Sequence, residues 1–472
     1  MPFLNRIQRW ADERPDDIAV VVAGRRISWA RLRDQAAVAA GTAPAVTVLA
    51  EANSVDFAIA FAAAVAGEGQ CAVLDPTWPP QIHQDVLQRL GESVHSQVAG
   101  GDASLTDGTL TDGDPGSSFL IGLTSGTTSV PKAFTRSRRS WQQSFDASIK
   151  FFGLGQDDKT LAPGPLAASL NLYALAECLY AGSEFHTLES FDVGDVHAAI
   201  SHDGITRLVL VPTMLRLLSE RGLTGCVDAS GVRTIICAGS KLDARTLEAA
   251  RRWAPNATIF EYYGASELSF VSGTGLRAGE PLDAGGTGIG KPFPGVEVRI
   301  LDDSGASLPD GDAGNISVRS GMVSNGYLWG DDGQALRSFD GWFTVGDQGY
   351  LDDGELHILG RRSDMIITAG KNVYPHEVEL ALASVPGVAA AVAAGMADDI
   401  RGQRVIAGVV ASHGGITATQ LRSGLENVLP REKRPLQYFA LAELPLTDRG
   451  KVSRRILLEW IDSHDRRIRR LG

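Results

Sequence analysis

The chain has 472 residues, of which 44% are hydrophobic and 21% are charged, and its formal net charge is -12. These values are ordinary for a soluble globular protein of roughly two to four domains. The acidic balance argues against a nucleic-acid-binding protein, which needs a basic face to neutralise phosphates. No apolar stretch reaches the roughly 20 residues that cross a bilayer, and the N-terminus lacks the segments of a signal peptide. We therefore expect a cytoplasmic protein of enzyme size without a membrane span.

The four cysteines are Cys71, Cys178, Cys226 and Cys237, and no two of them are spaced as in a CxxC motif. No histidines lie nearby at the spacing of a zinc site. Three of the cysteines stand among apolar or small residues, which is typical of buried, unreactive thiols. This pattern fits a reducing compartment.

Short apolar runs alternate with longer helical patterns through about the first 290 residues. We expect strands at Ile18–Val22, Val46–Ala50, Ala72–Leu74, Phe119–Leu123, Leu208–Val211, Thr234–Ala238 and Thr258–Tyr262. We expect helices at Trp29–Ala40, Ser54–Gly67, Leu170–Tyr180 and Ala244–Trp253. Such alternation predicts layered sheets with helices on their faces.

From about Val296 the pattern changes to short strands separated by Asp/Gly turns. Strand-like segments lie at Val296–Leu301, Asn315–Arg319 and Gly349–Leu359. Turn sequences such as Asp352-Asp353-Gly354 are hairpin signals. We therefore expect a smaller, antiparallel, β-rich subdomain.

A third pattern begins after residue 361. Helices are expected at Pro375–Val385 and Thr417–Val428, and strands at Ala389–Gly395, Val405–Ala411 and Gln437–Leu441. The basic residues from His464 to Arg470 are interpreted as a solvated helix end, with contact to an anionic partner as the weaker alternative. The predicted fold class is thus α/β. A large N-terminal domain (1–361) has layered sheets and the β-rich subdomain, and a small α+β C-terminal domain (362–472) follows.

A hydroxyl-rich loop follows the expected strand Phe119–Leu123. Residues 124–132 read Thr-Ser-Gly-Thr-Thr-Ser-Val-Pro-Lys. Hydroxyl and backbone N–H groups can bind an anion, and Lys132 adds a positive charge. The spacing is not GxxxxGK[ST], so the loop is not a P-loop of that class. Taken alone, a polar turn without a ligand remains the alternative.

Three further motifs follow in chain order. The first, Glu261-Tyr262-Tyr263-Gly264-Ala265-Ser266-Glu267, comes at the end of an expected strand and could be only a polar strand end. The second consists of GWFTVGD at residues 341–347 and GRRSD at residues 360–364. The third, LPLTDRGK, ends on Lys451, and a lone lysine after a glycine turn is normally just solvated.

Together these four motifs resemble the adenylate-forming superfamily of acyl- and aryl-CoA synthetases, stand-alone adenylation domains and firefly luciferase. The family patterns are [ST]SG[ST]TGxPKG, YGxTE, GWxxTGD with GRxxD, and LPxTxxGK. This chain departs from the first at Ser129 and Ala133, where the family usually has glycine, and serine resists the positive φ that glycine accepts. The motifs occur in the family order from Thr124 to Lys451, so the chain is identified as a member of that superfamily.

The resemblance implies ATP and Mg²⁺ as cofactors. It implies that Tyr263 lies near the adenine, Ser266 at the α-phosphate, and Glu267 at Mg²⁺, a cation that favours carboxylate and phosphate oxygens. Asp347 would accept hydrogen bonds from the ribose hydroxyls, and Arg361 would contact ribose or phosphate. The residues implied in nucleotide or CoA binding are Thr124, Ser125, Gly126, Thr128, Gly239, Ser240, Tyr262, Tyr263, Gly264, Ser266, Asp347, Arg361 and Gly370.

The resemblance also implies catalytic roles for Lys451, Glu267, Thr127 and Lys132. In the family, the C-terminal domain is a mobile lid whose lysine acts during adenylation. The lid then rotates about a hinge residue, which is Ser363 here and aspartate or lysine in most members. Gly370, in an expected strand Ala369–Asn372, would let the pantetheine chain of CoA pass.

The expected helix within Ala167–Gly182 carries clues to the acid. Amino-acid-activating relatives place an aspartate there, and Ser169 stands at that position, so an α-amino acid is not expected, because a buried ammonium needs a charged partner. Ser169, Asn171 and Tyr173 are expected to line a small apolar pocket for a fatty, branched or aryl acid. Glu177 is interpreted as solvent-facing or structural, with contact to a more distant amine as the alternative.

The predicted function is ATP-dependent activation of a carboxylic acid to an acyl-adenylate, followed by transfer to a thiol, with CoA as the preferred acceptor. A stand-alone enzyme that loads the phosphopantetheine of an acyl carrier protein is the alternative. A catalytically inactive, adenylate-binding regulatory protein is a third hypothesis, supported only by the departures at Ser129, Ala133 and Ser363. A luciferase would share the first half-reaction, but no residue indicates one.

Overall fold

The structure is a computed structural model that describes residues 3–98, 110–124, 131–277, 279–280, 288–331, 333–412, 415–446 and 452–472. The chain forms two compact units. The first consists of Met1–Leu282, Ile289–Val298 and Ser317–Val345, and the second of Asp283–Gly288, Arg299–Ile316 and Gly346–Gly472. The predicted domain boundary between residues 361 and 362 falls within the second unit and stays a prediction.

The largest sheet of the first unit has nine strands. They are β1 (Ile18–Val22), β2 (Arg25–Ser28), β7 (Lys159–Leu161), β8 (Glu184–Thr187), β9 (Arg207–Leu210), β10 (Thr234–Ala238), β11 (Thr258–Ala265), β12 (Ser269–Leu276) and β13 (Lys291–Pro292). Their order is β13-β12-β11-β10-β9-β7-β8-β1-β2. Strands β9, β10 and β11 run parallel, whereas β11 and β12 form an antiparallel hairpin.

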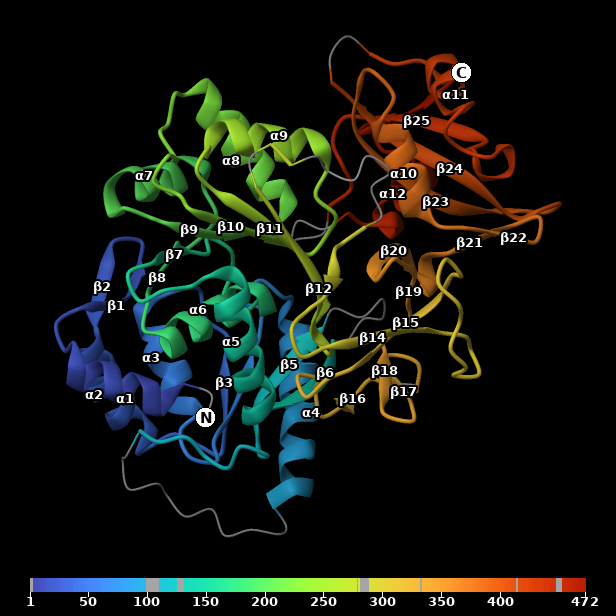
Figure 1. The fold of residues 1–472 in the computed structure, drawn as a ribbon. Helices are drawn as coiled ribbons and strands as arrows, with labels where there is room; N and C mark the ends of the chain where they lie inside the picture. The colour runs from blue at the N-terminus through green and yellow to red at the C-terminus, as the bar shows by residue number, and fades with distance from the viewer. Residues whose placement is uncertain are drawn as a thin grey trace. The chain divides into compact units, whose positions relative to one another are not determined.

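Helices cover this sheet on both faces (Figure 1). The helices of the first unit near it are α1 (Leu4–Glu13), α2 (Trp29–Ala40), α3 (Val55–Ala64), α5 (Arg138–Phe152), α6 (Ser169–Ala181), α7 (Val193–Asp203), α8 (Pro212–Thr224) and α9 (Ala244–Trp253). Leu208, Leu210 and Ile235 share a buried core with residues of α7, α8 and α9. Because strand neighbours point to opposite faces, Arg207 and Val209 face α5 and α6 instead.

A second sheet of the first unit carries the start of the hydroxyl-rich loop. Its strands are β3 (Val46–Leu49), β4 (Gln70–Val73), β5 (Ser118–Thr124), β6 (Lys132–Ser137) and β16 (Tyr327–Trp329), in the order β16-β6-β5-β4-β3. Helix α4 (Pro80–Val98) packs on it through Val86 and Leu90, which share a core with Ile121 and Ala133. Ala133 pairs with Leu123 in a regular ladder, so this position needs none of the freedom of glycine.

The expected β-rich part consists of short antiparallel strands. Strands β17 (Arg337–Phe339) and β18 (Trp342–Thr344) form a hairpin in the first unit, and β14 (Glu297–Leu301) and β15 (Gly314–Arg319) contain residues of both units. In the second unit β19 (Asp347–Asp352) pairs antiparallel with β20 (Glu355–Arg361). Asp353 and Gly354 form the turn with φ values of 47° and 74°, which an Asp-Gly hairpin turn requires.

The rest of the second unit is a six-stranded sheet with helices on both faces. Its elements are the 3₁₀ turns η1 (Arg362–Asp364) and η2 (Arg431–Lys433), the strands β21 (Ile366–Thr368), β22 (Lys371–Val373), β23 (Val388–Asp398), β24 (Gly402–Ala411), β25 (Gln437–Leu441) and β26 (Ile468–Leu471), and the helices α10 (Pro375–Ala383), α11 (Ala418–Leu425) and α12 (Arg454–Asp462). Leu382 and Leu421 belong to one core, and Leu457 belongs to another with Ile406 and Phe439.

Two local expectations in this unit are wrong. Residues 468–471 are not a helix end but an edge strand, because Leu471 pairs with Tyr438 in β25 and buries its side chain. Arg469 and Arg470 are nevertheless exposed. Ala369 and Gly370 are not strand residues but the two-residue turn between β21 and β22, with φ values of 48° and 75°.

The expected fold class is confirmed: layered α/β sheets, short antiparallel strands and a C-terminal α+β fold. Helices α2 and α9 and strands β1, β10 and β25 have the predicted bounds. In the part of the chain that the structure describes, no helix combines the length and apolar character that a membrane span requires.

Candidate functional site

The loop between β11 and β12 presents Ser266 and Glu267. Gly264 pairs with Phe270, and a Cβ atom on Gly264 would lie 2.3 Å from the carbonyl oxygen of Ser269. Only glycine therefore allows the two strands to approach this closely before the turn. Ser324 donates its backbone N–H to the carbonyl oxygen of Glu267 at 2.7 Å. The sequence thus forms a tight, anchored loop at the end of the sheet.

Tyr327 of β16 connects two of the predicted site residues. Its hydroxyl donates a short hydrogen bond to the Oε1 atom of Glu267, whose residue is 9% exposed. A second hydrogen bond joins Tyr327 to the side chain of Thr124, where the hydroxyl-rich loop begins. Burial raises the pKa of Tyr327, and the Glu267 carboxylate raises it further. The phenol therefore stays protonated and remains a donor at neutral pH.

Arg136 of β6 supports the same loop from the interior. Its guanidinium donates to the carbonyl oxygens of Met322 and of Ser266, the latter at 2.6 Å. Burial lowers the pKa of Arg136 to about 10, and the charge of Glu267 opposes this effect. A permanent positive charge therefore lies behind the Ser266–Glu267 loop.

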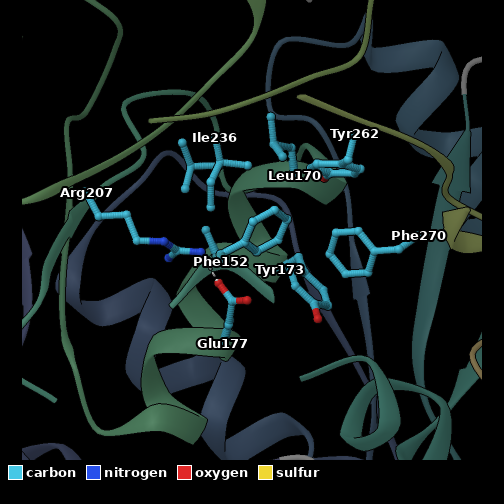
Figure 2. Close-up of a pocket in the computed structure, with 10 residues that line it drawn as sticks. Phe152, Leu170, Tyr173, Glu177, Arg207, Ile236, Tyr262 and Phe270 are labelled. Carbon is cyan, nitrogen blue, oxygen red and sulfur yellow. Dashed lines mark hydrogen bonds and ion pairs between the residues drawn. The ribbon is translucent and has the colours of Figure 1, made fainter. Parts of the chain in front are cut away.

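A small pocket lies between the large sheet and helices α5 and α6. Ten side chains line it: Phe152, Leu170, Tyr173, Ala174, Glu177, Arg207, Val209, Ile236, Tyr262 and Phe270. Figure 2 shows the rings of Tyr173, Tyr262 and Phe270 on one side, and Arg207 and Glu177 meeting on the other. The pocket is thus mostly aromatic and aliphatic, with one charged pair.

The charged pair is an ion pair between β9 and α6. The Nη2 atom of Arg207 lies 2.5 Å from the Oε2 atom of Glu177, and each side chain is only 2% exposed. Burial alone would lower the pKa of Arg207, but the Glu177 carboxylate raises it above its ordinary value. Of the two roles expected for Glu177, the solvent-facing one is wrong, because the α6 face that carries it packs toward the sheet, and the buried ion pair fits the structural one.

Ser169 and Tyr173 lie along the same helix but have different surroundings. The Ser169 hydroxyl is 3.2 Å from the Ser266 hydroxyl, whereas Tyr173 lines the pocket. The Tyr173 hydroxyl points away and bonds to serine hydroxyls of α5. Asn171 is not among the ten lining residues, and its amide packs against Gly164. The start of α6 therefore connects the pocket to the Ser266–Glu267 loop.

Gly239 and Ser240, which are expected to bind the nucleotide or CoA, directly follow β10. Gly239 has a φ of 96°, which favours glycine. The buried Glu261 carboxylate of β11 accepts a hydrogen bond from the Leu242 backbone N–H at 2.6 Å and lies 3.1 Å from the Lys241 Nζ atom. This carboxylate fixes the loop beside β11. Tyr262 and Tyr263 follow it there, and because strand residues alternate, only the first of the two lines the pocket.

Four of the expected residues that the structure describes belong to the second unit. Asp347 and Arg361 are paired across β19 and β20, and the Arg361 Nε atom lies 3.4 Å from an Asp347 carboxylate oxygen. Ser363 is exposed in η1, and its hydroxyl bonds to Asp364. Gly370 occupies the hairpin turn described above. The predicted functions of these residues stay predictions.

Several expected residues cannot be compared with the structure. Ser125, Gly126, Thr127, Thr128 and Lys451 lie outside the described residues. Lys132 is described and pairs with Thr124 across the β5–β6 hairpin, so the hydroxyl-rich loop begins and ends on adjacent strand residues.

The site residues fit a magnesium ion that is shared with a nucleotide. Within the described ranges, no three histidines, cysteines or acidic residues gather as metal ligands. Glu267 instead offers one buried carboxylate, which accepts a hydrogen bond from the Tyr327 hydroxyl. Mg²⁺ commonly takes one or two protein carboxylates and completes its shell with phosphate oxygens and water.

Comparison with known proteins agrees with this geometry. Residues 89–328 match the model of the AMP-binding enzyme family, and residues 377–451 match that of the AMP-binding enzyme C-terminal domain. The chain belongs to the AMP-binding enzyme family. This membership implies the use of ATP. It also confirms the enzyme class expected from the sequence, an acid–thiol ligase that forms an acyl-AMP intermediate.

Relatives of this AMP-binding enzyme include named ligases. An uncharacterized acyl–CoA ligase of Bacillus subtilis is 30% identical over 96% of this chain and 97% of its own length. Indoleacetate–CoA ligase of Aromatoleum aromaticum is 32% identical over 79% of this chain and 71% of its own length. Among solved structures, ATP-bound MatB from Rhodopseudomonas palustris superposes with a TM-score of 0.83 at 25% identity, covering 98% of this chain and all of MatB.

Three residues near the candidate site were not foreseen from the sequence. Arg207 begins an otherwise apolar strand, where an isolated charge signals a buried partner, whereas Arg136 shares β6 with Lys132 and Thr135 and carries no such signal. Tyr327 likewise had no signal, because its partner Glu267 lies 60 positions away in the sequence. The sheet order alone brings Tyr327 to the loop.

Proposed function

We propose that this AMP-binding enzyme activates a carboxylic acid with Mg²⁺ and ATP and transfers the acyl group to CoA. The observation that carries the proposal is that one helix, α6, both lines the apolar pocket and contacts the Ser266–Glu267 loop. Leu170, Tyr173 and Glu177 line an apolar pocket, and Ser169 at the start of the helix touches Ser266, which precedes Glu267. An acid with its tail in the pocket would present its carboxylate at Ser266. Relatives named as CoA ligases support CoA as the acceptor.

The chemistry requires positioning more than activation. The carboxylate of the acid is already ionised, and its oxygen attacks the α-phosphorus of ATP, forming a mixed anhydride and releasing pyrophosphate. Holding the two reactants together and neutralising the phosphates supply most of the rate. Bound Mg²⁺ would neutralise phosphate charge. Glu267 would orient that ion, Tyr327 would hold Glu267 in place, and Lys451 would stabilise charge at the α-phosphate.

The first test is pyrophosphate exchange with a panel of fatty, aryl and dicarboxylic acids. Acid-dependent exchange of labelled pyrophosphate into ATP is expected for at least one acid. No exchange with any acid, in a folded preparation, would support the alternative of an inactive adenylate-binding protein. CoA and phosphopantetheinylated carrier protein, added separately, distinguish the proposed acceptor from the second candidate.

The metal assignment has its own test. Glu267→Gln removes a charge but little volume and should raise the Mg²⁺ concentration needed for half-maximal exchange. Glu248→Gln, on the exposed face of α9, is the matched control and should behave as wild type. Equal magnesium requirements in both variants would remove Glu267 from the proposed metal site.

A further inference from the structure

The candidate metal carboxylate of Glu267 shares its surroundings with a buried cation. Arg136 of β6 is 3% exposed, and its guanidinium donates to the carbonyl oxygens of Met322 and Ser266, the latter at 2.6 Å. Ser266 directly precedes Glu267 in the chain. Burial lowers the pKa of Arg136, and the negative charge of Glu267 opposes this effect. The two opposite charges therefore interact across the Ser266 peptide.

Glu267 is held in place at both its backbone and its side chain. Ser324 donates its backbone N–H to the Glu267 carbonyl oxygen at 2.7 Å, and the Tyr327 hydroxyl donates to the Oε1 atom. Because Glu267 is 9% exposed and Arg136 is buried, water screens their charges only in part. At neutral pH the fixed carboxylate and the guanidinium therefore form a pair with no net charge.

Such a pair distinguishes bare Mg²⁺ from Mg²⁺ bound to ATP. A bare ion at Glu267 would add two positive charges near Arg136, and like charges at short range inside a protein are unfavourable. The complex with ATP is an anion, because the phosphates outweigh the charge of the metal. Its phosphate oxygens also complete the shell of an ion that one carboxylate holds. Only the complex therefore brings the charge that balances Arg136.

We propose that Arg136 keeps Glu267 from binding Mg²⁺ alone, so that the metal enters the site as its complex with ATP. The proposal rests on the proposed function, since it takes Glu267 as the metal ligand. Arg136 is then a positioning residue that acts through Glu267 and Ser266 and does not touch the reacting atoms.

A purely structural Arg136 would give a different result. Its hydrogen bonds join β6 to Ser266 and to Met322, and their loss alone would weaken the binding of every ligand at this loop. The electrostatic role instead predicts effects of opposite sign. Removal of the charge should strengthen the binding of a bare divalent cation and weaken the binding of metal-free ATP. The signs of the two changes therefore separate the two roles.

Mn²⁺ tests the proposal in the absence of nucleotide, acid and CoA, because it favours the same oxygen ligands and its binding is measured by electron paramagnetic resonance. Wild type and Glu267→Gln should bind it equally weakly. Arg136→Met removes the charge and should bind Mn²⁺ about tenfold or more tightly than wild type, since a unit charge several ångströms from a divalent ion has at least this effect inside a protein. Glu267→Gln, combined with Arg136→Met, should abolish the gain.

Two further variants serve as controls. Arg136→Lys keeps the charge and should retain the weak Mn²⁺ binding of wild type. Arg139→Met, at an exposed position of α5, should also behave as wild type. Binding of ATP in the presence of EDTA should weaken several-fold in Arg136→Met and stay unchanged in Arg139→Met. If Arg136→Met does not fold, Arg136→Gln takes its place, because glutamine removes the charge but can still donate to a carbonyl oxygen.

Three results would overturn the proposal. They are a Glu267-dependent Mn²⁺ site in wild type without nucleotide, an unchanged Mn²⁺ affinity in a folded, uncharged Arg136 variant, and an equal gain in Arg136→Lys. The first result needs no Arg136 variant. The proposed function fails separately: no pyrophosphate exchange with any acid would refute it and leave the Mn²⁺ result standing. Exchange together with any of the three results would refute only the role of Arg136.

Discussion

Tyr327→Phe removes a single hydroxyl that connects β5, where the hydroxyl-rich loop begins, to the candidate metal carboxylate. The Tyr327 hydroxyl donates a hydrogen bond to Glu267 and is also hydrogen-bonded to Thr124. Phenylalanine keeps the ring and its edge-to-face contact with Phe134, where the ring centroids are 6.2 Å apart. The variant therefore changes the orientation of Glu267 with little change in packing.

The magnitude follows from the charge of the acceptor. A hydrogen bond to a charged group contributes about 1.5–3 kcal/mol, and every 1.4 kcal/mol or so is a factor of ten in affinity. Glu267 is 9% exposed, so water can replace the lost donor only in part. We expect the lower end of this range, an approximately tenfold rise in the Mg²⁺ concentration required at saturating ATP.

Two measurements test this expectation. Pyrophosphate exchange is titrated with Mg²⁺, and the rise in melting temperature on adding Mg²⁺ with ATP is recorded in the absence of acid, since ligand binding stabilises the folded state by mass action. Tyr180→Phe is the matched control, because Tyr180 donates to the Asp146 carboxylate at 2.8 Å elsewhere in the same unit. If Tyr327→Phe matched the control in both titrations, Tyr327 would not position a metal ligand.

The remaining predictions concern the second unit. Lys451→Ala should slow adenylate formation about 100-fold or more, which is the effect of losing one charge-stabilising donor. The variant should still convert synthetic acyl-adenylate to thioester at the wild-type rate, and loss of both steps would refute a role confined to adenylation. Ser363→Pro should impair thioester formation more than adenylation because proline fixes φ, and equal losses would exclude Ser363 as the pivot. Burial raises the pKa of Glu379, but His376 and Arg454 outweigh it and leave the pKa below its ordinary value. The stability that Glu379 contributes is therefore present above its unfolded pKa of about 4.3 and lost as pH falls through the folded value. Glu379→Gln should lower the melting temperature at neutral pH and not near pH 3; a pH-independent difference would contradict this.

Local sequence patterns predicted the individual elements well. The run Thr234–Ala238 and the amphipathic Ala244–Trp253 have the observed bounds, because alternation and helical periodicity reflect which face each element buries. The Asp353-Gly354 turn was equally readable, since its φ values suit those residue types. The patterns failed at residues 468–471, where an arginine-rich segment is a strand only because β25 offers it a free edge.

The candidate site was also only partly predictable from the sequence. The motifs predicted Ser266 and Glu267 as part of a candidate site and led to the family, because their chemistry is local. The pairing of Glu177 with Arg207, 30 positions later, and of Glu267 with Tyr327, 60 positions later, depends on which strands become neighbours and in which register. Only burial decides that Glu177 is a charged wall of a pocket rather than a solvated helix residue. The sequence by itself therefore determined the class of reaction, whereas the tertiary structure decided the shape and polarity of the pocket beside α6.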